Sequence, residues 1–165
     1  MKTLSDNLHA VQARISAACA ASDRSPDSVQ LLAVSKTFSA EDVRQVAVCG
    51  QLDFGENYIQ EGVDKIVALQ SAPYPLMWHC IGPIQSNKTK LVAEHFDWVH
   101  TVDRLKIAQR LNDQRPAHVP PLNVCLQVNI DGGETKSGLA PAEVLALAQE
   151  VAKLPRLVLR SEEHT

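Results

Sequence analysis

The chain has 165 residues, of which 45% are hydrophobic and 21% are charged, as in an ordinary globular domain. This length allows one soluble domain with a hydrophobic core and is too short for two domains of the usual size. The formal charge of −3, the scattered lysines and arginines and the low aromatic content of 4% argue against a nucleic-acid-binding surface, so a small molecule or a protein is the expected partner.

The first segment predicts an amphipathic helix. Apolar residues recur on one helical face over residues 3–21, at Leu4, Leu8, Val11, Ile15 and Ala18. The stretch "SDRSPDS" then ends the helix. The opening residues "MKTLSDNLHA" lack the apolar stretch of a secretory signal, and no apolar run has the length of a membrane span. We therefore expect a cytoplasmic protein that does not contact a membrane.

Strand-like and helical segments alternate through the rest of the chain. Strands are expected at residues 30–36, 52–55, 76–81, 97–102, 122–130 and 157–160. Helices are expected between them, at residues 40–49, 58–70, 86–95, 103–113 and 141–153. Ser39 is the predicted N-cap of the first of these helices, with Asp42 three residues later. This repeat of strand and helix predicts a parallel sheet covered by helices.

Two architectures remain open at this point. Eight such repeats would form a (β/α)8 barrel, which typically needs about 250 residues. The six predicted strands therefore indicate either an open, doubly wound sheet or about two-thirds of a barrel. After Arg160 the chain turns to "SEEHT", which offers no apolar side chain to a buried strand, and "RSEEHT" resembles translated sequencing-adapter sequence. We expect one incomplete barrel domain over residues 1–160 and a foreign tail over residues 161–165.

The four cysteines are expected to be reduced and structural. Cys19, Cys49, Cys80 and Cys125 are widely spaced, and none of them forms a C-x-x-C pair. Each lies in an apolar context that suits a small buried side chain.

Polar residues gather where the predicted strands end, which is where α/β proteins place their sites. The first strand ends in Ser35, Lys36 and Thr37, the second runs into Asn57, and the third contains His79. The fifth is followed by "DGGETKSG", which contains Lys136. Each residue alone also fits a structural role, since a strand-end lysine is often a solvated charge, an asparagine often caps a helix and a histidine in an apolar run is often a core residue.

Several common sites are excluded by the motifs. "GGETKSG" is not a Walker loop, because Lys136 precedes Gly138 instead of following it. The chain has no G-x-G-x-x-G after a strand, no G-x-S-x-G and no H-E-x-x-H, and its histidines show no metal-ligand spacing, so no metal site is expected. An amine within a cluster at strand ends remains, and this arrangement suits a lysine that forms a Schiff base with a carbonyl.

Four motifs in register carry a resemblance to a known family. The stretches "LLAVSKT", "FGENYIQEG", "WHCIGPIQSNK" and "ETKSG" closely resemble the pyridoxal phosphate homeostasis proteins of the YggS/PROSC type. The fold of that family is similar to the barrel domain of alanine racemase. The resemblance extends from the first helix to about Arg160 and favours a (β/α)8 TIM barrel of the alanine racemase-like type, truncated after about strand six, over an open sheet.

The resemblance implies pyridoxal 5'-phosphate (PLP) as cofactor and assigns four residues to it. Lys36 is implied to form the internal aldimine with PLP. Asn57 matches a position that lines the cofactor pocket, His79 a position close to the ring, and Lys136 a basic position that faces the phenolic oxygen. PLP-dependent apoenzymes are possible protein partners, and the full-length form is expected to be a monomer.

The same resemblance favours a cofactor carrier without catalytic residues. Two alternatives stay open, namely a small PLP-dependent amino-acid racemase and an open-sheet protein that binds a different small molecule. A racemase needs a second acid or base, usually a tyrosine from another domain or subunit, and the only tyrosines here are Tyr58 and Tyr74. In such barrels the phosphate often binds to loops after strands seven and eight, so we expect this anchor to be missing.

Overall fold

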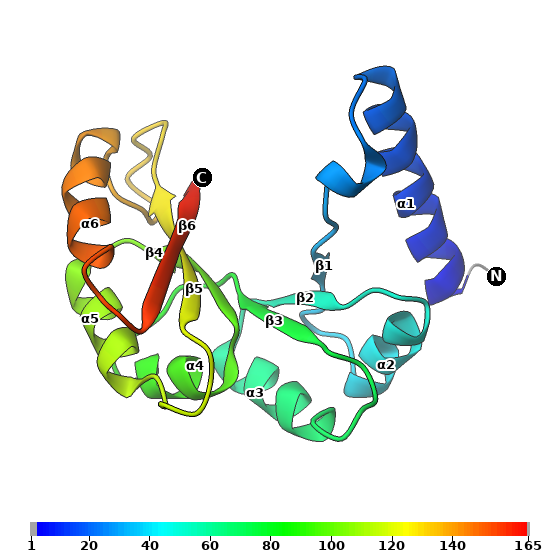
Figure 1. Ribbon diagram of the computed structural model, residues 1–165, viewed down its shortest axis with the longest axis horizontal. Helices are drawn as coiled ribbons and strands as arrows, with labels where there is room; N and C mark the ends of the chain where they lie inside the picture. The colour runs from blue at the N-terminus through cyan, green and yellow to red at the C-terminus, as the bar shows by residue number, and fades with distance from the viewer. Residues whose placement is uncertain (1–2, 165) are drawn as a thin grey trace.

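The computed structural model describes residues 3–164, in which six parallel strands form one sheet (Figure 1). In chain order the elements are α1 (Leu4–Ala21), η1 (Pro26–Ser28), β1 (Ala33–Val34), α2 (Ala40–Val48), β2 (Asp53–Glu56), α3 (Ile59–Ala68), β3 (Met77–Cys80), α4 (Thr89–His95), β4 (Trp98–Val102), α5 (Leu105–Gln114), β5 (Leu122–Val128), η2 (Pro141–Glu143), α6 (Val144–Val151) and β6 (Leu157–His164).

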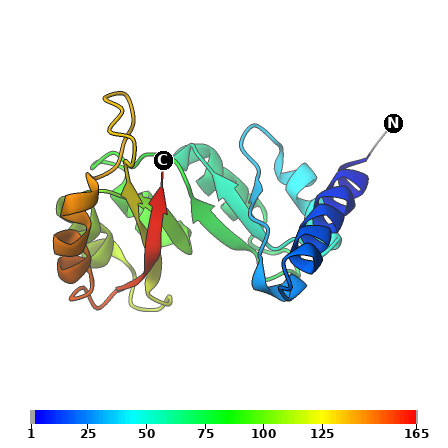
Figure 2. The same ribbon diagram turned by 90° about the horizontal axis from the view of Figure 1, so that it is seen from above.

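The order of the strands in the sheet follows the order of the chain, from β1 to β6, and every neighbouring pair is parallel. In a doubly wound sheet the order in which strands are added reverses at a switch point, so later strands lie on the other side of the first one. In a (β/α)8 barrel each new strand lies beside the one before it. Figures 1 and 2 show a curved sheet with α2 to α6 on its outer side. The fold is therefore that of a barrel segment, and the open doubly wound alternative is wrong.

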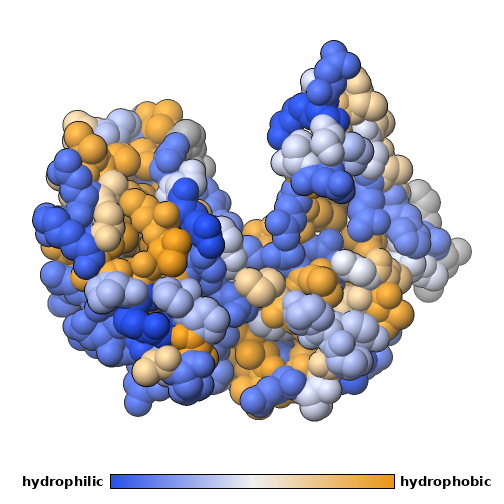
Figure 3. Space-filling view, in the orientation of Figure 1, coloured by the Kyte–Doolittle hydropathy of each residue, from blue (hydrophilic) through white to orange (hydrophobic). Residues whose placement is uncertain are grey.

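The two faces of the sheet differ in chemistry. The outward side chains of the strands are apolar and buried against the helices, as Phe54, Val99, Val124 and Leu126 show. Polar side chains such as His79 occupy the inner face, because successive residues of a strand point to opposite sides. Figure 3 shows that the molecule is hollowed on this inner side, between the part around α1 and the part around α6.

Most predicted elements are confirmed, with differences at their ends. Ser39 caps α2 as predicted, in a capping box with Asp42. The helices α4 and α5 begin later than Ser86 and Asp103, at Thr89 and Leu105, and neither has a side-chain cap. Residues 141–153 contain a short 3-10 helix before α6.

The first strand is shorter than the predicted range of residues 30–36. Its ladder with β2 pairs only Ala33 and Val34, since β1 lies at the edge of the sheet and has no second neighbour among residues 3–164. At the opposite edge, β6 does not end near Arg160 as expected, because Ser161, Glu162 and Glu163 continue the ladder with β5. Backbone hydrogen bonds do not require apolar side chains, and these three residues are exposed.

The four cysteines are free, and Cys19, Cys80 and Cys125 are buried as expected, whereas Cys49 is only half-buried. Within residues 3–164 no helix is long and apolar enough to cross a membrane. The same residues contain no group of three or more His, Cys, Asp or Glu side chains placed to hold a metal ion.

Candidate functional site

Lys36 lies just beyond the carboxyl end of β1. The N–H of the preceding residue, Ser35, still donates to the carbonyl of Gly55 on β2 at 2.9 Å, so the strand pairing extends up to Lys36. Ser35 is buried, whereas the Lys36 side chain is exposed. Lys36 has no hydrogen-bond or ion-pair partner among residues 3–164. Its amine is therefore available to a ligand without the loss of an existing contact.

A buried charged group, here called the Lys65 cluster, lies beneath this strand end and consists of Ser35, Glu56, Glu61 and Lys65. The Nζ atom of Lys65 lies 2.6 Å from Oε1 of Glu56 and 2.7 Å from Oε1 of Glu61. It also donates to the carbonyl of Ser35 at 2.6 Å. The Ser35 hydroxyl donates to Oε1 of Glu56, again at 2.6 Å. Glu56 is 0% exposed and Lys65 is 6% exposed, so these charges are removed from water.

The same cluster holds the residue after Lys36. Thr37 has a φ of 67°, a left-handed conformation that is unusual for a β-branched residue. Its N–H donates to Oε1 of Glu61 at 2.6 Å. The hydrogen bond from Lys65 is the main factor that holds the pKa of Glu61 below its ordinary value, and the Thr37 N–H adds to it. The backbone on both sides of Lys36 is thus bound to one buried network.

Asn57 follows β2 at the same edge of the sheet. The N-cap of α3 is Tyr58, so Asn57 does not serve as the cap that an asparagine at this position might suggest. Its Oδ1 atom is buried and has no hydrogen-bond partner among the described residues. An unpaired buried acceptor is costly unless a partner arrives, so this oxygen can accept a hydrogen bond from a ligand.

His79 lies on the inner face, and both of its ring nitrogens are engaged. Nε2 lies 3.0 Å from Oδ1 of Asp53 and Nδ1 lies 2.9 Å from Nε2 of His100, while the ring stacks on Trp98 at 5.3 Å between centroids. Burial is the main factor that lowers the pKa of His79, opposed by the hydrogen bond with Asp53. A neutral His79 that donates to Asp53 accepts from His100, which fixes its tautomer. His79 can therefore offer its ring to a ligand, but not a free nitrogen.

Lys136 lies on the loop between β5 and η2. Its Nζ pairs with Oδ2 of Asp131 at 2.5 Å, and the amide of Asn129 binds the carbonyls of Gly133 and Lys136. No contact within residues 3–164 joins Lys136 to the other three candidate residues. The structure therefore places Lys136 at the correct end of the sheet but in a separate group.

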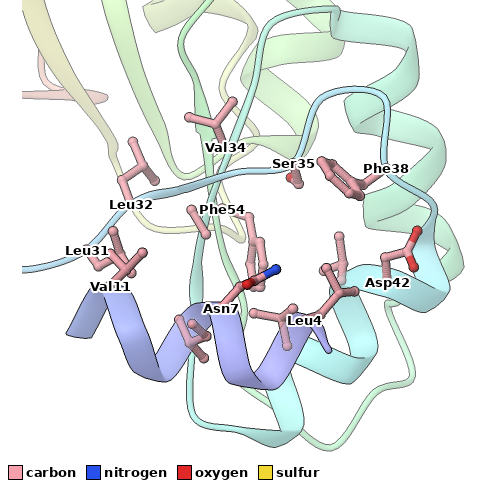
Figure 4. A pocket seen from close by; sticks show the side chains of 14 residues that line it. Leu4, Asn7, Val11, Leu31, Leu32, Val34, Ser35, Phe38, Asp42 and Phe54 are labelled. Atoms are coloured by element: carbon pink, nitrogen blue, oxygen red, sulfur yellow. The ribbon is translucent and has the colours of Figure 1, made fainter. Parts of the chain in front are cut away.

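An apolar groove of about 310 Å³ lies beside the candidate site and is distinct from it. In Figure 4, Leu4 and Val11 come from α1, and Leu31 and Phe38 lie before and after β1. Lys36 does not line this groove, whose polar lining residues are Asn7, Ser35 and Asp42. The groove lacks the reactive group that the sequence singles out.

The unpaired amine of Lys36 at the strand end fits the aldehyde of the cofactor that the sequence implies. The buried amide oxygen of Asn57, which has no partner among the described residues, fits a ligand group that donates a hydrogen bond. The sequence singles out Lys36 and Asn57, which stay predictions as cofactor-binding residues, and it also places Glu56 among the polar residues at the end of the second strand. Glu61 and Lys65 are not expected from the sequence as members of this group. The spacing of four residues between Glu61 and Lys65 was the available signal, and it usually indicates an exposed helix pair.

The sequence is similar to a known family and to proteins of known name. The profile of the family described as "Alanine racemase, N-terminal domain" matches residues 7–161. A pyridoxal phosphate homeostasis protein of Pseudomonas aeruginosa is 58% identical over 160 residues, which cover 97% of this chain and 69% of that protein. The protein of the same name from Escherichia coli K12 is 56% identical over 161 residues, with the same coverage of 97% and 69%.

Solved structures show the same fold. PipY of Synechococcus elongatus PCC7942, solved with PLP bound, matches with a TM-score of 0.80 and 31% identity and covers 99% of this chain and 70% of its own. An alanine racemase of Clostridium difficile matches with a TM-score of 0.66 over 82% of this chain and 35% of its own. At 17% identity this second match concerns the fold alone.

Proposed function

Because this chain belongs to the pyridoxal phosphate homeostasis proteins, within the alanine racemase N-terminal domain family, we propose that it binds PLP and takes part in the intracellular homeostasis of that cofactor. The relatives from Pseudomonas aeruginosa and Escherichia coli K12, at 58% and 56% identity, carry this name, and the related PipY has been solved with PLP bound. Membership of the family supports PLP as the ligand, and the geometry around Lys36 supports where it attaches.

The attachment is a Schiff base with Lys36, and one observation supports this most. Lys36 is exposed at a strand end and unpaired within the described range, while the backbone on both sides of it is fixed. The cofactor supplies the aldehyde. The neutral amine of Lys36 would form a C=N bond with the aldehyde carbon, and its two hydrogens would leave with the aldehyde oxygen as water.

The other three residues take supporting roles in this proposal. The buried Oδ1 of Asn57 would accept a hydrogen bond from the ligand, and His79, whose ring nitrogens are held by Asp53 and His100, would offer its ring to the cofactor. Lys136 would face the phenolic oxygen only after it exchanges its pairing with Asp131.

Reductive labelling tests the proposal. The chain is incubated with PLP, reduced with borohydride and digested, and the labelled peptide is identified by mass spectrometry. We expect the label on Lys36, and we expect Lys36→Ala to lose the aldimine absorbance band on titration with PLP. A label on Lys65, Lys88 or Lys136 with Lys36 unlabelled, or an unchanged titration of Lys36→Ala, would contradict the assignment and favour a protein that does not use PLP in this way.

We further propose that the protein is a carrier and has no racemase or aminotransferase activity. A racemase needs a second acid or base, usually a tyrosine from another domain or subunit. The two tyrosines of this sequence are Tyr58, which is 64% exposed at the start of α3, and Tyr74, which packs against the hydrophobic core. PLP-dependent apoenzymes in the cytoplasm would receive the cofactor from a monomeric full-length form. Loss of optical activity from L-amino acids faster than with free PLP would instead favour the racemase alternative.

A further inference from the structure

The backbone around Lys36 is held by two charged side chains of α3. Lys65 reaches from α3 to the carbonyl of Ser35, and Glu61 reaches from the same helix to the N–H of Thr37. These two contacts lie one residue before and one residue after Lys36. The pair Glu61–Lys65 therefore binds the segment from both sides.

The Lys65 cluster joins β1, β2 and α3 at a cost in desolvation free energy, because it takes charged groups out of water. Two carboxylates face a single lysine, and the second oxygen of Glu56 is buried without a partner in the described part of the chain. A buried ion pair is often no more stable than apolar side chains of similar volume, but it does fix one geometry. The cluster is accordingly better explained by the position that it imposes than by the stability that it adds.

The imposed position includes backbone strain. A left-handed backbone is unfavourable for a β-branched residue such as Thr37, and such residues persist where the surrounding structure holds them. The carboxylate of Glu61 provides that hold through the Thr37 N–H. Without it, Thr37 would relax toward ordinary backbone angles, and the direction in which Lys36 leaves the strand would change.

We propose that Glu61 and Lys65, supported by the buried Glu56, are positioning residues that fix the direction of the Lys36 amine toward its carbonyl ligand. This inference rests on the proposed function, since it assumes that Lys36 is the reacting amine. The three residues do not contact the ligand. They act through the backbone of Ser35 and Thr37.

Variants of Glu61 test the proposal, because this residue is 31% exposed and its loss is tolerated better than that of buried Glu56 or Lys65. Glu61→Ala removes the acceptor of the Thr37 N–H, whereas Glu61→Gln keeps an oxygen at that place. Glu94→Ala is the matched control, because Glu94 also pairs with a lysine four residues away, on α4. The double variant Glu61→Ala with Thr37→Gly removes the strain that Glu61 opposes.

Two measurements are made on each variant. The first is the rate at which Lys36 is labelled by PLP and borohydride, which we expect Glu61→Ala to lower by about tenfold or more, since small misplacements of a reacting group cost this much. The second is amide hydrogen exchange at Thr37 without any ligand, which we expect to speed up by about tenfold on loss of one hydrogen bond. Glu61→Gln and the double variant should recover most of the labelling rate, and Glu94→Ala should change neither value.

The outcomes separate the two proposals. Labelling of Lys36 at the same rate in Glu61→Ala as in the unsubstituted chain would overturn the positioning role and leave the proposed function intact. A loss of labelling that Thr37→Gly does not restore would also overturn it, since the effect would then not run through the Thr37 backbone. No label on Lys36 in the unsubstituted chain would contradict the proposed function. Unchanged hydrogen exchange at Thr37 in Glu61→Ala would by itself overturn the positioning role of Glu61.

Discussion

The imidazole of His79 combines burial with two fixed hydrogen-bond partners. Desolvation favours its neutral form and lowers its pKa, while the hydrogen bond with Asp53 acts in the opposite direction and His100 adds to the lowering. Because the pKa of His79 is lower in the folded chain than its ordinary value of 6.5, the unfolded chain binds more protons between these two values. The stability that neutral His79 contributes is therefore complete above about pH 6.5 and is lost as the pH falls below it.

The loss of stability at low pH that we expect from His79 leads to a prediction for His79→Gln. Glutamine can still bond to its neighbours but does not titrate, so the variant should lose less stability than the unsubstituted chain when the pH falls from 7.5 to 5. Urea denaturation at several pH values, followed by circular dichroism, measures the difference. His118→Gln replaces an exposed histidine and serves as the control. An identical pH dependence in the unsubstituted chain and in His79→Gln would show that desolvation of His79 does not govern this range.

At the scale of residues, sequence reasoning finds reactive groups more readily than the groups that hold them. Lys36 was singled out because a cation is unusual at the end of an apolar strand, and the motif match reinforced it. Lys65 lies within an amphipathic helix at a spacing typical of an exposed pair, so nothing in the pattern indicates that it is buried. The contacts of His79 and His100, which lie 21 residues apart in the chain, follow only from the register of the sheet.

At the scale of elements, the end of β3 packs directly on the loop that carries Asn57. A Cβ atom added at Gly82 would lie 2.0 Å from the backbone oxygen of Asn57, and this backbone cannot yield as a flexible side chain could. We expect Gly82→Ala to destabilise the fold by about 1–3 kcal/mol, the usual cost of overpacking, and to displace Asn57.

Thermal denaturation and labelling of Lys36 by PLP measure these two effects of Gly82→Ala. The control is Gly133→Ala, because the nearest atoms to an added Cβ there belong to side chains of the same loop, at 3.1 Å or more. Equal melting temperatures for Gly82→Ala and the unsubstituted chain would contradict the close contact with Asn57.

Hydrophobic periodicity predicted the elements well where side chains also mark their ends. The capping box of Ser39 and Asp42 placed the start of α2 correctly. The starts of α4 and α5 were predicted two or three residues early, because Lys88 and Arg104 occupy their N-cap positions without a side-chain hydrogen bond. The length of β1 was overestimated, because an apolar run does not reveal that a strand has a partner on one side only.

At the scale of the whole molecule, periodicity could not distinguish a barrel from an open sheet, since both consist of the same repeat. The sequential strand order and the curvature decide the question (Figures 1 and 2). The parallel pairing of β1 with β2 places their carboxyl ends side by side, so that Lys36 and Asn57 come to one rim. Because all six strands are parallel, the loop after β5, with Lys136, lies at another part of the same rim.

The final prediction concerns how firmly these 165 residues retain PLP. The homologue from Pseudomonas aeruginosa is longer, since this chain covers 69% of it. In (β/α)8 barrels a phosphate is frequently held by the loops after strands seven and eight and by a helix N-terminus, whereas the sheet described here has six strands with β1 and β6 at its edges. A Schiff base without a phosphate anchor is readily hydrolysed, so we expect a polypeptide of these residues to bind PLP at least about tenfold more weakly than the full-length homologue. This factor corresponds to the loss of roughly 1.4 kcal/mol of binding free energy.

Absorbance titration of both proteins with PLP measures the two dissociation constants, and titration with pyridoxal, which lacks the phosphate, provides the control. The two proteins should differ less with pyridoxal than with PLP. Equal affinities for PLP would mean that the six strands already contain the phosphate site, and the search for it would move to the loops after β1, β2 and β5.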